Sequence, residues 1–174
     1  MPIYALGEQV PKIAPDAYVH PDAVVIGSVV IGSESSIWPN AVLRGDYGRI
    51  EIGRRTSIQD GTVIHATPTM ATIVGDECVV GHNVHLEGCT IEDRVLVGSA
   101  STLLHRVIVR TGAVVGAGAV LPGGVEVPSG SMALGVPAQI RLDAATGDYV
   151  SAGVASYAEN AARYRSDLRR IDSE

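Results

Sequence analysis

The stretch Ile91–Val127, which reads IEDRVLVGSASTLLHRVIVRTGAVVGAGAVLPGGVEV, decides the fold. An aliphatic side chain recurs at every sixth position along it, at Ile91, Val97, Leu103, Val109, Val115, Leu121 and Val127. An α-helix needs a period of about 3.6 residues and a simple strand a period of about 2. A six-residue period instead fits a short strand and a turn, repeated as one face of a parallel β-helix with the aliphatic side chain inside.

The same period runs through the first half of the chain. It passes through Ile31, Ile37 and Leu43, then Ile52, Ile58 and Ile64, then Val74, Val80 and Leu86. Three hexapeptides close one triangular coil of about 18 residues, so residues 13 to 140 give about seven coils. We predict an all-β solenoid, a parallel β-helix whose successive coils pair about 4.8 Å apart.

The composition fits a narrow solenoid and argues against several classes of partner. The chain has 174 residues and no phenylalanine, yet 46% of it is hydrophobic, so small aliphatic side chains must fill a thin core. The net charge of −6 and the lack of a Lys/Arg cluster argue against nucleic acid. No apolar run reaches the roughly 20 residues that cross a membrane. The start, MPIYALGEQV, lacks a charged segment followed by an apolar one, so we expect a cytoplasmic protein. Cys78 and Cys89 are expected to be inert, buried thiols.

Residues 142–174 carry a different pattern. Their apolar residues are spaced alternately by four and three, which is typical of an amphipathic helix. The stripe consists of Val150, Val154, Tyr157, Ala161, Tyr164, Leu168 and Ile171. We therefore predict a β-helix domain over 1–141 and a C-terminal α-helix within 142–174. That helix should pack on the outside of its own or a neighbouring solenoid.

Two interruptions break the six-residue period. The step from Leu43 to Ile52 is nine residues and the step from Ile64 to Val74 is ten. We expect the extra residues of both segments to bulge from a corner of the solenoid. Functional sites often lie at such interruptions.

The register places charged side chains on outward ladders. Arg44, His65 and Glu87 each follow an inward aliphatic residue at the same place in three successive coils, so they should stack about 4.8 Å apart. Asp60 and His82 should stack in the same way on the adjacent face. Imidazoles and carboxylates in this arrangement are material for a metal site.

The two ladders are expected to lie about one face-width apart, so His65 and His82 are too distant to share a metal ion within one chain. In a ring of identical solenoids, one face of each chain meets the adjacent face of the next. His65 and Glu87 of one copy would then meet His82 of its neighbour, and Arg44 would face Asp60. The sequence thus predicts a cyclic homo-oligomer with a metal site between subunits.

The third protein ligand stays open at this stage. Glu87 lies one coil from His65, but His85 also points outward, about 6.5 Å along the strand from Glu87. His85 is therefore a rival ligand or a partner that supports the ligands. His20 and His105 lie outside the ladders, and we expect them to be solvated surface.

Four motifs resemble those of the γ-class carbonic anhydrase-like hexapeptide proteins. They are Arg44-Gly45-Asp46, Ser57-Ile58-Gln59-Asp60-Gly61 with His65 after it, Gly81-His82, and Gly135-Val136-Pro137-Ala138 before the helix. The resemblance covers nearly the whole chain. It implies a left-handed β-helix, a homotrimer, and a zinc or iron ion at each subunit interface.

The resemblance also implies roles for individual residues. The three histidine ligands of the family correspond to His65, His82 and position 87. Other functional positions of the family correspond to Arg44, Asp46, Gln59 and Asp60. Tyr157 and Asn160 correspond loosely to helix residues that approach the site in relatives. Two features depart from the family. Glu87 stands where the family usually has histidine, and the loop after His65 lacks the acid that shuttles protons in some relatives.

The function implied by the resemblance is reversible hydration of carbon dioxide to bicarbonate at a zinc, iron or cobalt ion. Zinc lowers the pKa of its bound water to about 7, and Gln59 could orient the water or bicarbonate. The extra negative charge of Glu87 should make that water less acidic and the reaction slower. Arg44, Asp46 and Asp60 can serve the interface alone. The alternatives are a metal-dependent hydrolase such as an acyl-CoA thioesterase, a non-catalytic trimeric scaffold subunit, and an acyltransferase of the same fold, which the histidine ladders disfavour.

Overall fold

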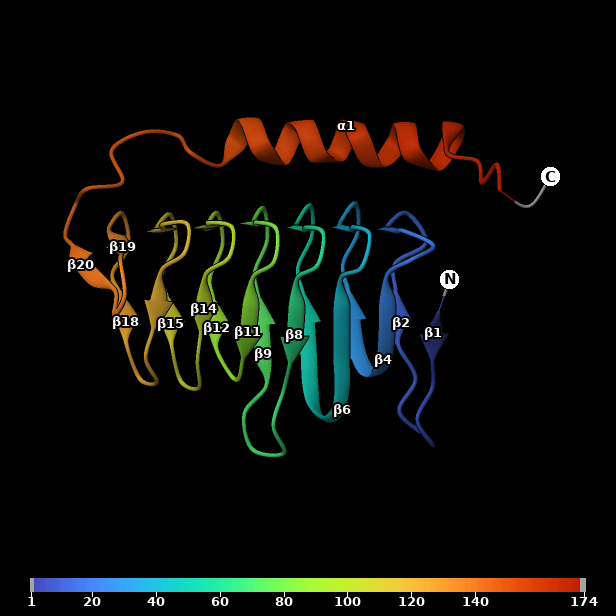
Figure 1. The fold of residues 1–174 in the computed structure, drawn as a ribbon, viewed down its shortest axis with the longest axis horizontal. Helices are drawn as coiled ribbons and strands as arrows, with labels where there is room; N and C mark the ends of the chain where they lie inside the picture. The colour runs from blue at the N-terminus through green and yellow to red at the C-terminus, as the bar shows by residue number, and fades with distance from the viewer. Residues whose placement is uncertain (1, 173–174) are drawn as a thin grey trace.

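The chain forms the predicted solenoid. The computed structural model describes residues 2–172, and in them twenty short strands wind into a left-handed parallel β-helix of about seven coils with one helix alongside (Figure 1). Successive coils contribute strands to three faces, which we name the ladder face, the third face and the helix face.

The strands of each face pair along the solenoid axis. The ladder face contains β1 (Ile3–Tyr4), the first parts of β4 (Val24–Ile31) and β6 (Val42–Ile52), β8 (Val63–His65), β11 (His85–Glu87), β14 (Thr102–Leu103) and β17 (Val120–Leu121). The third face contains β2 (Lys12–Ile13), the last parts of β4 and β6, β9 (Thr72–Val74), β12 (Thr90–Ile91), β15 (Ile108–Val109) and β18 (Glu126–Val127). The helix face contains β3 (Tyr18–Val19), β5 (Ser36–Ile37), β7 (Ser57–Ile58), β10 (Val79–Val80), β13 (Leu96–Val97), β16 (Val114–Val115), β19 (Met132–Leu134) and the antiparallel β20 (Gln139–Arg141).

The residues of the six-residue period form the core. Leu86 pairs in register with Ile64 in the coil before it and with Leu103 in the coil after it, and all three are 0% exposed. Burying a side chain of this size contributes about 1.5–3 kcal/mol. Cys78 and Cys89 also lie inside as free thiols, so their expected burial is confirmed, and burial raises the pKa of each to about 12.

The first interruption bulges at its corner as expected, because the register between β4 and β6 shifts there and Ser28 alone stands opposite residues 46–49. β6 runs unbroken around the corner, with Arg44 pairing with His65 near one end and Ile52 pairing with Val74 at the other. The neighbouring β4 is also long and pairs with β6 on both sides of the corner. The two backbones approach so closely that a Cβ atom on Gly27 would lie 2.4 Å from the carbonyl oxygen of Gly45, so only glycine fits there.

The second interruption does leave the solenoid. Residues 66–71 form a loop between β8 and β9 that is closed by an antiparallel bridge between Thr67 and Met70. This loop extends beyond the other corners on its side of the molecule (Figure 1).

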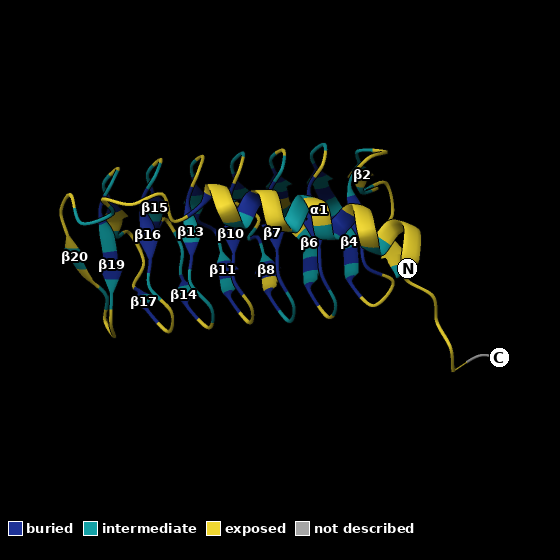
Figure 2. Ribbon diagram, turned by 90° about the horizontal axis from the view of Figure 1, so that it is seen from above, coloured by how far each residue is buried: buried dark blue, intermediate teal, exposed yellow. Residues whose placement is uncertain are grey.

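The helix α1 (Ser151–Asp167) lies along the helix face and runs back toward the first coils (Figures 1 and 2). Val154 and Ala161 are its buried residues, and they pack in clusters with Val79 and Trp38 of the solenoid. The predicted apolar stripe is longer than the helix. Its last two residues, Leu168 and Ile171, are exposed because the backbone turns extended at Leu168.

His20 is not the solvated residue that we expected. It is 8% exposed, and the rings of Tyr18 and Tyr164 lie 6.3 and 6.5 Å from its ring centroid. Its Nδ1 accepts the backbone N–H of Asp22 at 3.1 Å. The last turns of α1 cover this position, so His20 packs under the helix. Among residues 2–172, no helix is long and apolar enough to cross a membrane.

Replacing Ile91 with alanine should lower the free energy of unfolding by about 2–5 kcal/mol, because it leaves a cavity at a fully buried position. The preceding residue, Thr90, points outward from the same strand. Thr90→Ala should therefore cost less than about 1 kcal/mol. Denaturant unfolding of both variants tests whether Ile91 points inward and Thr90 outward. Equal losses in the free energy of unfolding would contradict this orientation.

Candidate metal site

The first predicted ladder exists as expected. Arg44 on β6 pairs in register with His65 on β8, and His65 pairs in register with Glu87 on β11. Each of the three follows an inward residue that is 0% exposed, namely Leu43, Ile64 and Leu86. The core therefore fixes the rung on which each functional side chain lies.

His65 is held between two carboxylates. Its Nδ1 lies 2.9 Å from Oε1 of Glu87, and its Nε2 lies 3.0 Å from Oδ1 of Asp46. Nη1 of Arg44 donates to the other oxygen of Asp46. Asp46 comes from the corner of β6, and only 15% of the His65 side chain is exposed. The result is a continuous chain of contacts from Arg44 through Asp46 and His65 to Glu87.

The contacts of the first ladder keep its acids ionised. The hydrogen bond with His65 lowers the pKa of Glu87, against the opposing effect of burial, and the nearby charges of His105, His65 and His85 add to it. Burial disfavours the charged form of Asp46, but hydrogen bonds with Arg44 and His65 outweigh it and lower the pKa of that carboxyl. Both groups can therefore hold a cation at neutral pH.

Two more histidines approach Glu87. Nε2 of His85 and Nε2 of His105 each lie 3.6 Å from Oε2 of Glu87. His105 lies outside the ladders as expected and 41% of its side chain is exposed, but its Nε2 atom is shielded from solvent. The sequence contains a pattern from which the approach of His105 to Glu87 could have been predicted. His105 lies two positions after the inward Leu103, as Gly88 lies two positions after Leu86, so the two share a corner.

The second predicted ladder also exists. Nδ1 of His82 lies 2.9 Å from Oδ2 of Asp60, and each side chain is 47% exposed. The opposite ring nitrogen, Nε2, points away from Asp60, as in histidines that bind a metal through one nitrogen and a carboxylate through the other. Gln59, beside Asp60, is buried.

The helix brings Tyr157 to the second ladder. Burial and the charge of Asp60 raise the pKa of Tyr157, while a hydrogen bond with Gln59 partly offsets them. Asn160, one turn further along α1, is half-buried. The sequence pattern placed Tyr157 on the apolar stripe of the helix, and the structure adds its ring contact with Trp38 at 5.6 Å between centroids.

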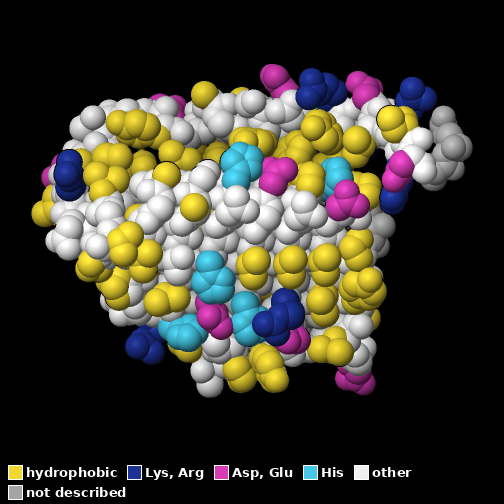
Figure 3. Space-filling view, in the orientation of Figure 1, with side chains coloured by type: hydrophobic (Ala, Val, Ile, Leu, Met, Phe, Trp, Pro, Cys, Tyr) yellow, Lys and Arg dark blue, Asp and Glu magenta, His cyan; other side chains and the backbone are white. Residues whose placement is uncertain are grey.

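Histidine and acidic side chains gather at two separate places, with hydrophobic side chains between them (Figure 3). Val63, on the ladder face, is 40% exposed although it is aliphatic. In the part of the chain that the structure describes, no three His, Cys, Asp or Glu side chains are placed together to hold a metal ion. One chain therefore presents two groups of donors on one side of the solenoid.

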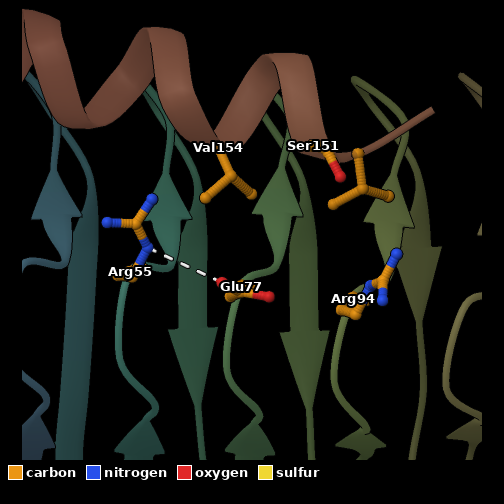
Figure 4. A pocket seen from close by; sticks show the side chains of 6 residues that line it. Arg55, Glu77, Arg94, Ser151 and Val154 are labelled. Carbon is orange, nitrogen blue, oxygen red and sulfur yellow. Dashed lines mark ion pairs between the residues drawn. The ribbon is translucent and has the colours of Figure 1, made fainter. Parts of the chain in front are cut away.

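A separate hollow under the first turn of α1 has other chemistry. It is lined by Arg55, Glu77, Arg94, Val150, Ser151 and Val154 (Figure 4). Nε of Arg55 lies 3.6 Å from Oε1 of Glu77, and its Nη1 lies 2.9 Å from Oε2 of Glu34. These ion pairs engage Arg55 and Glu77, and the lining contains no histidine or cysteine.

Comparison with known proteins decides the family. The chain is 38% identical over 142 residues to a protein of Methanocaldococcus jannaschii named as a probable carbonic anhydrase, and the match covers 82% of this chain and 86% of that protein. The chain belongs to the γ-carbonic-anhydrase-like family of hexapeptide-repeat proteins. It is also 42% identical over 135 residues to mitochondrial γ carbonic anhydrase 2 of Arabidopsis thaliana. That match covers 74% of this γ-carbonic-anhydrase-like chain but only 49% of the plant protein.

Other matches agree on the fold and carry other names. The family model described as bacterial transferase hexapeptide (six repeats) matches residues 11–45. A crystal structure from Bacillus cereus, described as a "putative acetyltransferase", has a TM-score of 0.89 and 33% identity, and covers 95% of this γ-carbonic-anhydrase-like chain and 98% of its own. The names thus span carbonic anhydrase and acyl-transfer chemistry on one scaffold.

The Glu87 contacts predict a pH dependence of stability in the metal-free protein. Because the pKa of Glu87 is lowered from its ordinary value of 4.5, its stabilisation is complete above pH 4.5 and is lost as the pH falls toward the folded-state pKa. The Tm difference between wild type and Glu87→Gln should therefore be widest near neutrality and should narrow as the pH falls below 4.5 and through the lowered folded-state pKa. Thermal unfolding in the presence of a chelator measures it, and a pH-independent difference would speak against the His65 contact.

Proposed function

We propose that this chain assembles as a homotrimer that binds a metal ion between subunits and hydrates carbon dioxide reversibly to bicarbonate. The observation that carries the proposal is the division of donors on one chain. An imidazole held by carboxylates lies on the first ladder, and a second imidazole held by a carboxylate lies on the other. Two copies in a ring would supply both groups to one site.

The donor types suit the metal, which would replace one of the two carboxylate contacts of the His65 ring. His65 and Glu87 of one chain with His82 of the next would give two imidazoles and a carboxylate, a set that zinc, iron and cobalt accept. Asp60 at Nδ1 of His82 supports the orientation of that ring. The 2.9 Å contact with His65 supports Glu87 over His85 as the third donor.

A bound zinc ion would lower the pKa of a coordinated water to about 7 and so supply a nucleophile at neutral pH. The chain's own residues would position and hold the reactants. Gln59, which is held by burial, can orient water or bicarbonate by hydrogen bonds. Arg44, which is bonded to Asp46 by one N–H group, keeps further N–H groups that we assign to Asp60 of the next subunit.

A cytoplasmic location is part of the proposal. Two free, buried thiols are typical of proteins from a reducing compartment.

Acyl chemistry is the second candidate, and the Bacillus cereus structure is the observation in its favour. At 33% identity and a TM-score of 0.89 it carries an acetyltransferase description. A thioester hydrolase would use the same metal donors, whereas an acyltransferase would not require them. Release of free thiol from a panel of acyl-CoA thioesters, with and without chelator, separates these activities from carbon dioxide hydration. A trimeric scaffold without catalysis would show neither activity.

Four variants, one of them a control, test the metal centre and the reaction together. His82→Ala and Glu87→Gln should lose most of the bound zinc, whereas Glu126→Gln, a matched change of an exposed acid on the third face, should keep it. Glu87→His should bind zinc and hydrate carbon dioxide about tenfold faster at neutral pH, because removing a negative charge makes the coordinated water more acidic. Elemental analysis and stopped-flow hydration assays measure these effects. No hydration above buffer in the zinc, iron and cobalt forms would reject the proposed reaction.

A further inference from the structure

The carboxylate of Glu87 has a histidine contact on each side. Oε1 contacts Nδ1 of His65 at 2.9 Å within the predicted ladder. Oε2 lies on the other side, 3.6 Å from Nε2 of His85 and 3.6 Å from Nε2 of His105. The ladder that this chain shares with its family does not account for the two histidines on the Oε2 side.

His105 presents an unsatisfied nitrogen to Oε2. Among the described residues, its Nε2 is buried and has no hydrogen-bond partner, although 41% of the side chain as a whole is exposed. A buried polar atom without a partner is costly, and 3.6 Å is too long for a hydrogen bond to Glu87. An ion that binds Nε2 of His105 and Oε2 of Glu87 at the same time would remove this cost.

The spacing of the two atoms suits a shared metal ion. Two donors on one tetrahedral zinc lie about 3.3–3.5 Å apart, given metal–ligand bonds of about 2.0–2.2 Å. The 3.6 Å between Nε2 of His105 and Oε2 of Glu87 is only slightly longer. A small rotation of either side chain would close the difference.

The backbone around His105 is fixed by its neighbours in the solenoid. The N–H of Arg106 donates to the carbonyl of Gly88 at 2.7 Å, and the N–H of Gly124 donates to the carbonyl of His105 at 2.9 Å. The ring packs over Gly88, where an added Cβ would lie 3.0 Å from Cδ2 of His105. The turn therefore holds the imidazole beside Glu87.

We propose that His105 supplies a further imidazole to the metal ion held by Glu87, on the Oε2 side of that carboxylate and in addition to the three donors of the proposed site. The inference rests on the proposed function, since it requires a metal centre at Glu87. The ion is of the class that takes imidazole and carboxylate together, with zinc first and cobalt as its spectroscopic substitute.

Zinc titration against a chelating dye tests the inference, with wild type, His105→Ala and His85→Ala compared in the full chain. His85→Ala is the matched control, because it removes an imidazole at the same 3.6 Å from the same oxygen. His105→Ala should weaken zinc binding by at least about tenfold, and His85→Ala by less than about threefold. His105→Gln, which keeps the approximate size of the side chain, should behave as His105→Ala.

The cobalt form gives a readout that a purely structural role would not change. The visible spectrum of bound Co²⁺ should change in His105→Ala but not in His85→Ala, and added imidazole should restore it. Unchanged zinc affinity and an unchanged Co²⁺ spectrum in His105→Ala and His105→Gln would overturn the inference. An equal loss in His85→Ala would overturn it as well.

Failure of the proposed function gives different results. A wild-type chain that binds no metal would overturn both proposals. A chain that binds metal in a His105-dependent way but does not hydrate carbon dioxide would reject only the reaction.

Discussion

The in-register stacking of inward aliphatic side chains is the constraint on which the rest of the structure depends. Each coil places one aliphatic residue on each face at the same height as its counterparts in the coils before and after, as Leu86 does between Ile64 and Leu103. The residue that follows each inward position must then point outward and stack on its counterpart. The core thus sets the positions of the chemically active side chains.

This constraint explains why the candidate site is divided. Two residues of one ladder, His65 and Glu87, occupy the same position in successive coils, so they meet at 2.9 Å. His82 belongs to a different position in the repeat and meets Asp60 instead. A chain with this period cannot bring the two imidazoles together through its regular strands alone. The helix packs on the helix face, with Tyr157 beside Gln59, and leaves the strands of the ladder face uncovered.

How far the sequence predicted the molecule follows from the same constraint. Both ladders were predictable, because the inward period fixes the position of each following residue in its coil and so the residue on which it stacks. The environments of His20 and the end of α1 were not, since they depend on where the helix lies and where it stops. The unbroken course of β6 depends on its pairing with β4 at Gly27 and Gly45, which a pattern in one segment does not reveal. The choice among Glu87, His85 and His105 depends on side-chain positions around one carboxylate, which the register alone does not distinguish.

The central claim is that each metal site is shared by two chains, and subunit mixing tests it most directly. Trimers of His65→Ala alone or His82→Ala alone would lack one half of every site. In trimers formed from equal amounts of both, about one interface in four would pair an intact His65 with an intact His82. A shared site predicts that zinc binding, lost in each variant alone, returns to about a quarter of the wild-type level in the mixture. No recovery in mixed trimers would contradict it.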